Sequence, residues 1–224
     1  MAKIILLRHL RSQWNEENRF NGWIDTPLLE GQKEKAKELS EKVSQFKIDA
    51  IFCSRLFRNM DTVARILEYD KKYPLFIHLD SGRMKDWGNF EDLSQDDIPV
   101  FVSEKLNERY YGELQGYNKE EAIKKYGEEK VRLWRRSWNE APPGGESLKD
   151  VSARTTPFFK KYIAGALKEG KNVLVVASHN SLRAVAKYLE KISDSDIINF
   201  EIPPAGIIEY EMGPELSIKN KRTL

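Results

Sequence analysis

Two nearly unbroken apolar runs constrain the fold of this chain more than any other feature. They span residues 3–9 and 172–179, and each ends in a histidine although the chain contains only 3 histidines. Continuous aliphatic runs, unlike alternating ones, are typical of strands buried on both faces of a parallel sheet. Ligands of open α/β sheets bind beyond the carboxyl ends of such strands. If the two strands are neighbours, His9 and His179 should therefore face each other across one site.

The remaining pattern predicts an α/β fold with a mostly parallel central sheet and helices on both faces. Shorter apolar runs predict strands at 49–53 and 98–102, and a closing edge strand at 206–210. Apolar residues at helical spacing predict helices at 30–46, 54–67, 117–138, 146–167 and 181–192. We expect one domain over 1–224, with an insertion or lid at about 79–103 and a helical lid over the site at about 117–140.

Composition excludes several classes of function. Lys plus Arg total 37 against 35 Asp plus Glu, so a net charge of +2 gives no global attraction to nucleic acid. The single Cys53 permits no internal disulfide, and no Cys/His spacing predicts structural zinc. The chain begins without a signal-peptide pattern and has no apolar run of membrane-spanning length. We expect a cytoplasmic protein with no nucleic-acid or membrane partner. Whether it forms a homo-oligomer stays open.

The predicted strand ends bring cations and imidazoles together. They carry Arg8 and His9, Arg58, and His179, while the helical lid adds Lys119, Arg135 and Arg136. Guanidinium forks bind phosphate or carboxylate through paired hydrogen bonds, so a small phosphorylated anion is the expected substrate. A neutral imidazole can carry a phosphoryl group, which suits His9. Glu108 is the candidate that moves a proton on and off the substrate oxygen.

Each of these residues also has an ordinary structural interpretation. A lone histidine at a strand end is more often a hydrogen-bonded packing residue than a catalyst. Arg135, Arg136 and Lys119 would commonly be solvated residues on a helix. The pairing of His9 with His179 and Arg8 reverses the balance in favour of a site.

Five blocks of sequence resemble the cofactor-dependent (2,3-bisphosphoglycerate-dependent) phosphoglycerate mutases. The blocks are 7–15, 18–28, 54–58, 106–119 and 180–184, and the resemblance covers nearly the whole chain apart from about 79–103. The wider histidine phosphatase superfamily shares only the arginine-histidine opening and the second histidine. The block LNERYYGELQG at 106–116, with Trp134-Arg135-Arg136, narrows the resemblance to the mutases.

The resemblance implies an interconversion of 3-phosphoglycerate and 2-phosphoglycerate, primed by 2,3-bisphosphoglycerate and needing no metal. It implies His9 as the phosphohistidine nucleophile, Glu108 as proton donor and acceptor, and His179 as stabiliser of the transferring group. The positions implied to hold that group are Arg8, Arg58, Ser12, Asn15 and Asn180. Those implied to bind the rest of the phosphoglycerate are Asn21, Gly22, Tyr111, Lys119, Arg135 and Arg136. Metal-dependent mutases are disfavoured because the chain lacks clustered Asp/His ligands.

The chain departs from this family beside both histidines. Leu10 follows His9 and Asn180 follows His179, where the family normally has glycine, and Arg11 adds a positive charge beside the nucleophile. Losing a glycine can shift a loop or remove an N–H that faces phosphate. Two alternatives therefore stay open: a histidine phosphatase of the same superfamily that acts on small phosphate esters, and a catalytically silent binding protein.

Overall fold

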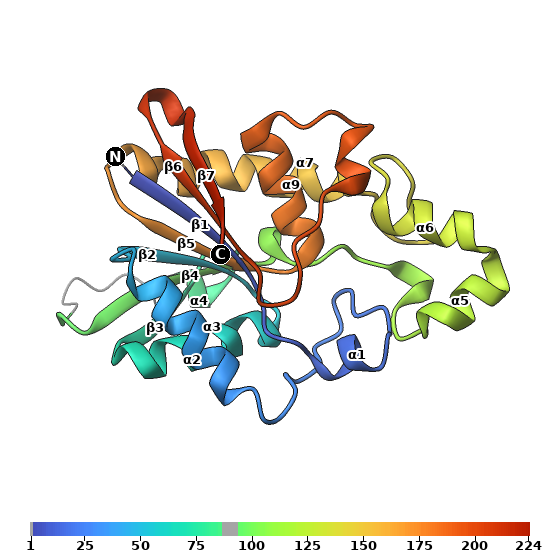
Figure 1. Cartoon of the computed structure of the whole chain (residues 1–224), viewed down its shortest axis with the longest axis horizontal. Helices are drawn as coiled ribbons and strands as arrows, with labels where there is room; N and C mark the ends of the chain where they lie inside the picture. The colour runs from blue at the N-terminus through green and yellow to red at the C-terminus, as the bar shows by residue number, and fades with distance from the viewer. Residues whose placement is uncertain (1, 87–93) are drawn as a thin grey trace.

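A seven-stranded sheet forms the centre of the molecule in the computed structural model, which describes residues 2–86 and 94–224 (Figure 1). The strand order is β3-β4-β2-β5-β1-β6-β7. The strands are β1 (Ala2–Arg8), β2 (Ala50–Ser54), β3 (Tyr73–His78), β4 (Asp97–Ser103), β5 (Val173–Ala177), β6 (Ile207–Met212) and β7 (Ile218–Thr223). The pairs among β3, β4, β2, β5 and β1 are parallel, whereas β6 and β7 run antiparallel. The predicted mostly parallel α/β sheet is confirmed.

The two histidine-bearing runs form adjacent strands. β1 pairs with β5 in parallel, and the register ends with Arg8 opposite Ala177. Alternate residues of β1 enter different apolar clusters, with Ile4 on one face of the sheet and Ile5 on the other, both fully buried. The apolar run is continuous because both faces of this strand are covered by helices.

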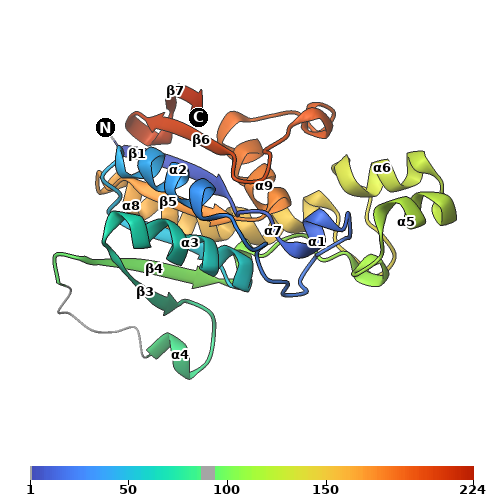
Figure 2. The same ribbon diagram turned by 60° about the horizontal axis from the view of Figure 1, so that its bottom comes forward.

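Helices cover both faces of the sheet (Figure 2). The helices α2 (Lys33–Ser44) and α3 (Phe57–Asp70) pack on one face. The other face is covered by α7 (Leu148–Phe158), α8 (Ala164–Lys168) and α9 (His179–Glu190). The helix predicted over 146–167 contains a π-helical turn at Phe159–Ile163. Pro157, which lacks a backbone N–H, interrupts the regular hydrogen-bond ladder just before this turn.

The predicted helix at 117–138 is wrong in its continuity. The structure has α5 (Lys119–Tyr126) and α6 (Glu128–Arg136) instead. Gly127 separates them with a φ of 87°, a left-handed value that a continuous right-handed helix does not accommodate.

Part of the predicted insertion at 79–103 belongs to the sheet. β4 lies between β3 and β2, so residues 97–103 form an inner strand rather than a lid. The segment also contains the short helix α4 (Arg83–Asp86), while 87–93 lie outside the described residues. β3 was not predicted because this edge strand is only half buried and has no clear apolar pattern. The assignment of the chain to one domain stays a prediction.

The strand predicted at 206–210 is present as β6, but it is not the edge strand. β7 pairs with its outer side and forms the edge of the sheet. The sequence of β7, Ile-Lys-Asn-Lys-Arg-Thr, is mostly exposed and polar, so hydropathy gave no signal for it.

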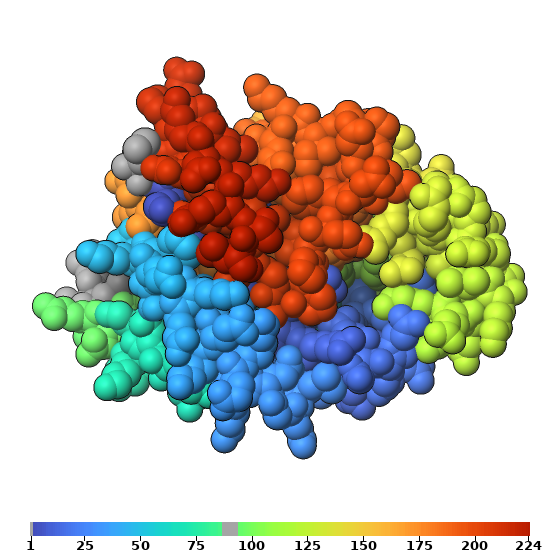
Figure 3. All heavy atoms as spheres, in the orientation of Figure 1, coloured from blue at the N-terminus to red at the C-terminus, as the bar shows by residue number. Residues whose placement is uncertain are grey.

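The segment 11–29, which contains the short helix α1 (Gln13–Glu16), lies with α5 and α6 beyond the carboxyl ends of the parallel strands (Figure 1). The molecular surface is hollowed where this segment, α5–α6 and residues 200–206, which precede β6, meet (Figure 3).

Among residues 2–86 and 94–224, no helix is long and apolar enough to cross a membrane.

Candidate active site

A polar cavity of about 110 Å³ lies at the carboxyl ends of β1 and β5. It is lined by Arg8, Asn15, Arg19, Phe20, Asn21, Gly22, Glu108, Tyr111, Lys119, Arg135, Arg136, His179, Asn180 and Glu201. Cationic side chains outnumber carboxylates in this lining. The cavity therefore suits an anionic ligand, as the sequence predicts. His9, Ser12 and Arg58 are buried and are not among the lining residues.

His9 is held as a neutral imidazole with one free nitrogen. Its Nδ1 lies 2.5 Å from the carbonyl oxygen of Leu10. A carbonyl only accepts hydrogen bonds, so Nδ1 carries the proton and Nε2 keeps its lone pair. Burial, together with the positive charges of Arg58 and Arg8, holds the pKa of His9 well below its usual value. This is the protonation state that a phosphoryl-accepting nitrogen requires.

His179 does not end its strand but opens the next helix. β5 ends at Ala177, and α9 begins at His179. Burial is the main reason that the pKa of His179 falls to about 4, although Glu201 opposes the shift. Its Nε2 lies 2.8 Å from Oε2 of Glu201. His179 is also among the causes of the lowered pKa of His9, which places the two imidazoles in one electrostatic environment.

The two arginines predicted beside the histidines have different surroundings. Arg8 lines the cavity and donates through NH1 to the carbonyl of Ile202 at 2.7 Å. Arg58 donates to the carbonyls of Ile24 at 2.9 Å and Gly22 at 2.7 Å. Arg58 thus fixes the loop that forms one wall, while its buried charge acts on His9.

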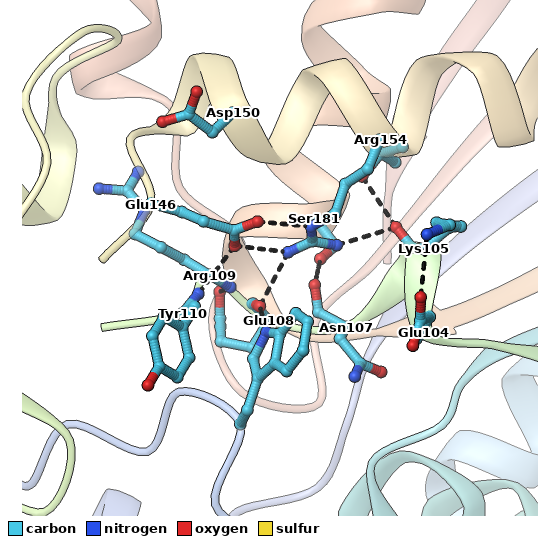
Figure 4. A network of polar contacts seen from close by, with 12 residues as sticks. Glu104, Lys105, Asn107, Glu108, Arg109, Tyr110, Glu146, Asp150, Arg154 and Ser181 are labelled. Atoms are coloured by element: carbon cyan, nitrogen blue, oxygen red, sulfur yellow. Dashed lines mark hydrogen bonds and ion pairs between the residues drawn. The ribbon is translucent and has the colours of Figure 1, made fainter. Parts of the chain in front are cut away.

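The loop that carries Glu108 is fixed from several sides (Figure 4). Arg154 of α7 donates to the carbonyls of Lys105 and Glu108, each at 2.9 Å, and pairs with the carboxylate of Glu146. From α9, Ser181 donates to the carbonyl of Asn107. Such fixation from separate elements holds the Glu108 carboxylate in a defined position.

The Glu108 carboxylate is buried but stabilised in its charged form. Its Oε1 accepts the backbone N–H groups of Arg109 at 2.7 Å and Asn180 at 3.2 Å. Burial alone raises the pKa of Glu108, but His179, these N–H donors and Arg58 together lower it. The side chain is therefore ionised near neutral pH and can accept a proton.

Small polar side chains shape the wall formed by the segment 11–29. Ser12 caps α1 and donates through Oγ to Oδ1 of Asn15 at 3.0 Å. Asn21 donates to the same hydroxyl oxygen at 3.3 Å. Gly22 has a φ of 54°, and a Cβ there would meet the side chain of Gln115. This position consequently favours glycine.

The helical lid supplies the cations on the opposite wall. Lys119 begins α5. Its pKa is lowered to about 8, mainly by burial and next by the positive charge of Arg135. Arg135 and Arg136 end α6. Tyr111 accepts a 3.1 Å hydrogen bond from Nδ2 of Asn180, which joins this wall to α9.

Sequence reasoning missed two buried arginines that fix the lid. Arg183 donates to the carbonyl of Arg136 at 2.8 Å, and Arg109 donates to the carbonyl of Trp134. Oδ1 of Asn180 accepts from both guanidinium groups, at 3.3 Å from Arg109 and 3.0 Å from Arg183. It also missed the lining residues Arg19, Phe20 and Glu201. Arg109 and Arg183 stand inside the quoted family blocks, but nothing in their residue type distinguished them from surface arginines.

The two departures from the family fit the local structure. Leu10 is fully buried in the core beside α2 and α3, and its N–H donates to Oγ1 of Thr62 at 3.1 Å. The N–H of Asn180 is directed to Glu108. Both backbone donors are thus used inside the fold, and Leu10 also supplies the carbonyl that sets the His9 tautomer.

The model of the histidine phosphatase superfamily (branch 1) matches residues 4–99 and 92–218. A 2,3-bisphosphoglycerate-dependent phosphoglycerate mutase of Methanococcus vannielii is 42% identical over 214 residues, covering 95% of this chain and 91% of that protein. The protein of the same name from Protochlamydia amoebophila is 40% identical over 227 residues, covering 99% of this chain and 100% of the relative.

Solved structures with the same fold include phosphatases. A mycobacterial glucosyl-3-phosphoglycerate phosphatase gives a TM-score of 0.76 at 22% identity, covering 100% of this chain and 97% of its own. An α-ribazole phosphatase from Shigella flexneri gives a TM-score of 0.72 at 20% identity, covering 100% of this chain and 96% of its own. These likenesses concern the fold alone. The family model and the sequence relatives show that the chain belongs to the histidine phosphatase superfamily and, within it, to the 2,3-bisphosphoglycerate-dependent phosphoglycerate mutases.

Proposed function

We propose that the protein interconverts 3-phosphoglycerate and 2-phosphoglycerate through a phosphohistidine on His9. The observation that carries this proposal is the state of the His9 ring, whose Nδ1 donates to the Leu10 carbonyl so that Nε2 is a neutral nucleophile. Glu108 lines the cavity and is a buried carboxylate with a lowered pKa. A carrier nitrogen and a proton-accepting group are the two functions that the transfer needs.

The proposed transfer exchanges a P–N bond for a P–O bond and moves one proton. The phosphoryl group leaves Nε2 of His9 for the hydroxyl oxygen of the bound monophosphoglycerate, so a P–N bond breaks and a P–O bond forms. Glu108 takes the hydroxyl proton, because its carboxylate is ionised before the step. In the return half, the phosphoryl group on the other carbon's oxygen passes back to Nε2. Glu108 then returns the proton to the leaving oxygen.

Several cavity residues are suited to stabilise the phosphoryl group during transfer. His179 Nε2 and Arg8 Nε are buried nitrogens without an aligned hydrogen-bond acceptor among the described residues. Phosphoryl oxygens would supply such acceptors. We assign Asn15 and Asn180 to the same group, with Ser12 and Arg58 holding the wall behind it.

The lid residues are suited to hold the rest of the substrate. Arg135, Arg136 and Lys119 present positive charge to the cavity, and Tyr111, Asn21 and Gly22 complete the lining. Guanidinium groups bind carboxylate in a forked geometry. The same donors fit 2,3-bisphosphoglycerate, which supplies the phosphoryl group that first loads His9. Among residues 2–86 and 94–224, no group of three or more His, Cys, Asp or Glu is placed to hold a metal ion.

The proposed substrates are small phosphorylated metabolites, and we place the reaction in the cytoplasm, without a nucleic-acid or membrane partner. The assay is incubation with 3-phosphoglycerate and catalytic 2,3-bisphosphoglycerate, followed by ³¹P NMR of the products. We expect 2-phosphoglycerate as the main product, a strong dependence on 2,3-bisphosphoglycerate, and no turnover by His9→Gln. Dominant release of orthophosphate would replace the mutase with a phosphatase. No turnover and no phosphorylated His9 would favour a binding protein.

A further inference from the structure

Glu201 is a carboxylate in the cavity to which the proposed chemistry gives no role. It follows the 3-10 helix η4 (Asp196–Asn199) and precedes β6, and its side chain is 47% exposed. Its Oε2 lies 2.8 Å from Nε2 of His179, and its Oε1 contacts a guanidinium nitrogen of Arg136. Both partners are groups that the proposed function assigns to the substrate anion.

The contacts of Glu201 neutralise the charge of Arg136, but they leave the donors of both partners incompletely used. Nε2 of His179 and NH1 of Arg136 are buried, and neither has an aligned hydrogen-bond acceptor among the described residues. Without aligned hydrogen bonds, these contacts lack the additional stabilisation that charge-assisted hydrogen bonds provide. An oxygen of a bound anion could therefore improve on the contacts that Glu201 makes.

The partners of Glu201 are held more firmly than Glu201 itself. His179 lies in the first turn of α9, and Arg136 lies in the last turn of α6, whose carbonyl accepts from Arg183. Glu201 stands between regular elements and is nearly half exposed. We therefore expect the carboxylate of Glu201, rather than His179 or Arg136, to move when an anion enters.

We propose that Glu201 is a displaceable internal counter-ion that competes with the substrate's anionic group for His179 and Arg136, and so sets the anion affinity of the cavity. The proposal rests on the proposed function only in taking these two residues as anion ligands. Its consequence is a cavity that binds its ligand less tightly than its cationic lining would allow. Weaker binding of the anion aids product release.

The test is the dissociation constant of orthophosphate, measured by isothermal titration calorimetry on full-length protein whose intact mass shows no phosphoryl group. Glu201→Gln removes the competing charge but keeps the size of the side chain. We expect orthophosphate to bind about fivefold more tightly to this variant, the effect of a partly exposed ion pair. Glu201→Asp keeps the charge on a shorter side chain, so its affinity should stay closer to that of the parent protein.

A matched control separates competition from a change in net charge. Glu169→Gln makes the same charge change at a surface residue with 63% exposure that pairs with Lys171. We expect its orthophosphate affinity to equal that of the parent protein. Equal tightening by Glu169→Gln and Glu201→Gln would overturn the proposal.

Two further results bear on the proposal. Unchanged or weaker orthophosphate binding by Glu201→Gln would overturn it, and a thermal melt of each variant shows whether weaker binding comes from an unfolded protein. If Glu201→Gln melts early, the titration is made at a temperature at which this variant is still folded, and the same outcomes decide: tighter binding supports the proposal, and unchanged or weaker binding overturns it. Because the readout is binding rather than turnover, failure of the mutase assay would not be mistaken for failure of this inference.

Discussion

At the scale of single residues, the protonation states of the two histidines are the main result. Nδ1 of His9 is engaged by a backbone carbonyl, and the pKa values of both imidazoles lie below the ordinary range. The sequence could predict the pairing of His9 with His179 because both follow apolar runs that become adjacent parallel strands. It could not predict Glu201, because that residue reaches the cavity from a segment without regular structure or a motif.

The lowered pKa of His179 predicts its NMR titration. Burial, as the largest cause, outweighs the opposing effect of Glu201 and lowers the pKa to about 4. The ring should therefore stay neutral as the pH falls from 7 to 5 and should take up a proton around pH 4. A ¹H–¹³C titration of histidine-labelled protein checks this, with His179→Gln identifying the resonance. A midpoint near 6.5, the ordinary value, would contradict the structure.

This shift also predicts how His179 affects stability. A histidine whose folded pKa is lowered binds its proton more readily in the unfolded chain. Its neutral form favours the folded state above pH 6.5, and this contribution is lost as the pH falls from 6.5 towards 4. Urea titrations at several pH values should show a shallower loss of the free energy of unfolding in His179→Gln than in the parent. Parallel losses in both proteins would contradict this expectation.

At the scale of elements, the site depends on how loops are attached to helices. Arg154 holds the Glu108 loop to α7, and Arg109 and Arg183 hold the end of α6 to α9. Apolar periodicity predicts where helices lie, but it carries no information on which buried arginine will satisfy which carbonyl. For the same reason the break at Gly127 and the polar strand β7 were not predicted.

Loss of the Arg154 fork should affect catalysis more than binding. Arg154→Lys keeps the charge but cannot donate to Lys105, Glu108 and Glu146 together. We expect kcat to fall about tenfold or more, with a smaller change in KM, because small displacements of a catalytic group are costly. The control is Arg132→Lys, whose exposed guanidinium contacts only Glu129 among its described salt-bridge partners. A kcat equal to that of the control would argue against this positioning role.

The loop at Gly22 gives a second test. Gly22 and Gly31 both have positive φ, of 54° and 73°, but only at Gly22 would a Cβ collide with a neighbour, the side chain of Gln115. Gly22→Ala should therefore destabilise the protein by more than Gly31→Ala, for which we expect about 1 kcal/mol. Urea denaturation measures both. Equal free energies of unfolding for the two variants would show that the wall of the cavity tolerates a side chain there.

At the scale of the whole molecule, net positive charge is concentrated in the cavity rather than spread over the surface. The chain carries a net charge of only +2, yet the cavity lining includes Arg8, Arg19, Lys119, Arg135 and Arg136 against two carboxylates. The fold assembles this field from segments far apart in the sequence, because the carboxyl ends of the parallel strands and the lid meet at one place. The sequence predicted which residue types would meet and a strand at 98–102, but not that this strand would lie inside the sheet, between β3 and β2.

This local field predicts a salt dependence. Steering of an anionic substrate into the cavity should make kcat/KM for 3-phosphoglycerate fall several-fold as ionic strength rises from about 0.01 M to about 0.15 M, as the Debye length shortens. Stopped-flow or steady-state assays at constant pH check this. A flat response would mean that local contacts alone determine capture.

The central claim is that His9 carries the phosphoryl group and that His179 does not. The most direct measurement is mass spectrometry of the protein after brief incubation with 2,3-bisphosphoglycerate, with the modified peptide located under conditions that preserve phosphohistidine. The account predicts one phosphoryl group, on the peptide containing His9, and none in His9→Gln. A phosphoryl group on the His179 peptide, or turnover without any phosphorylated histidine, would contradict it.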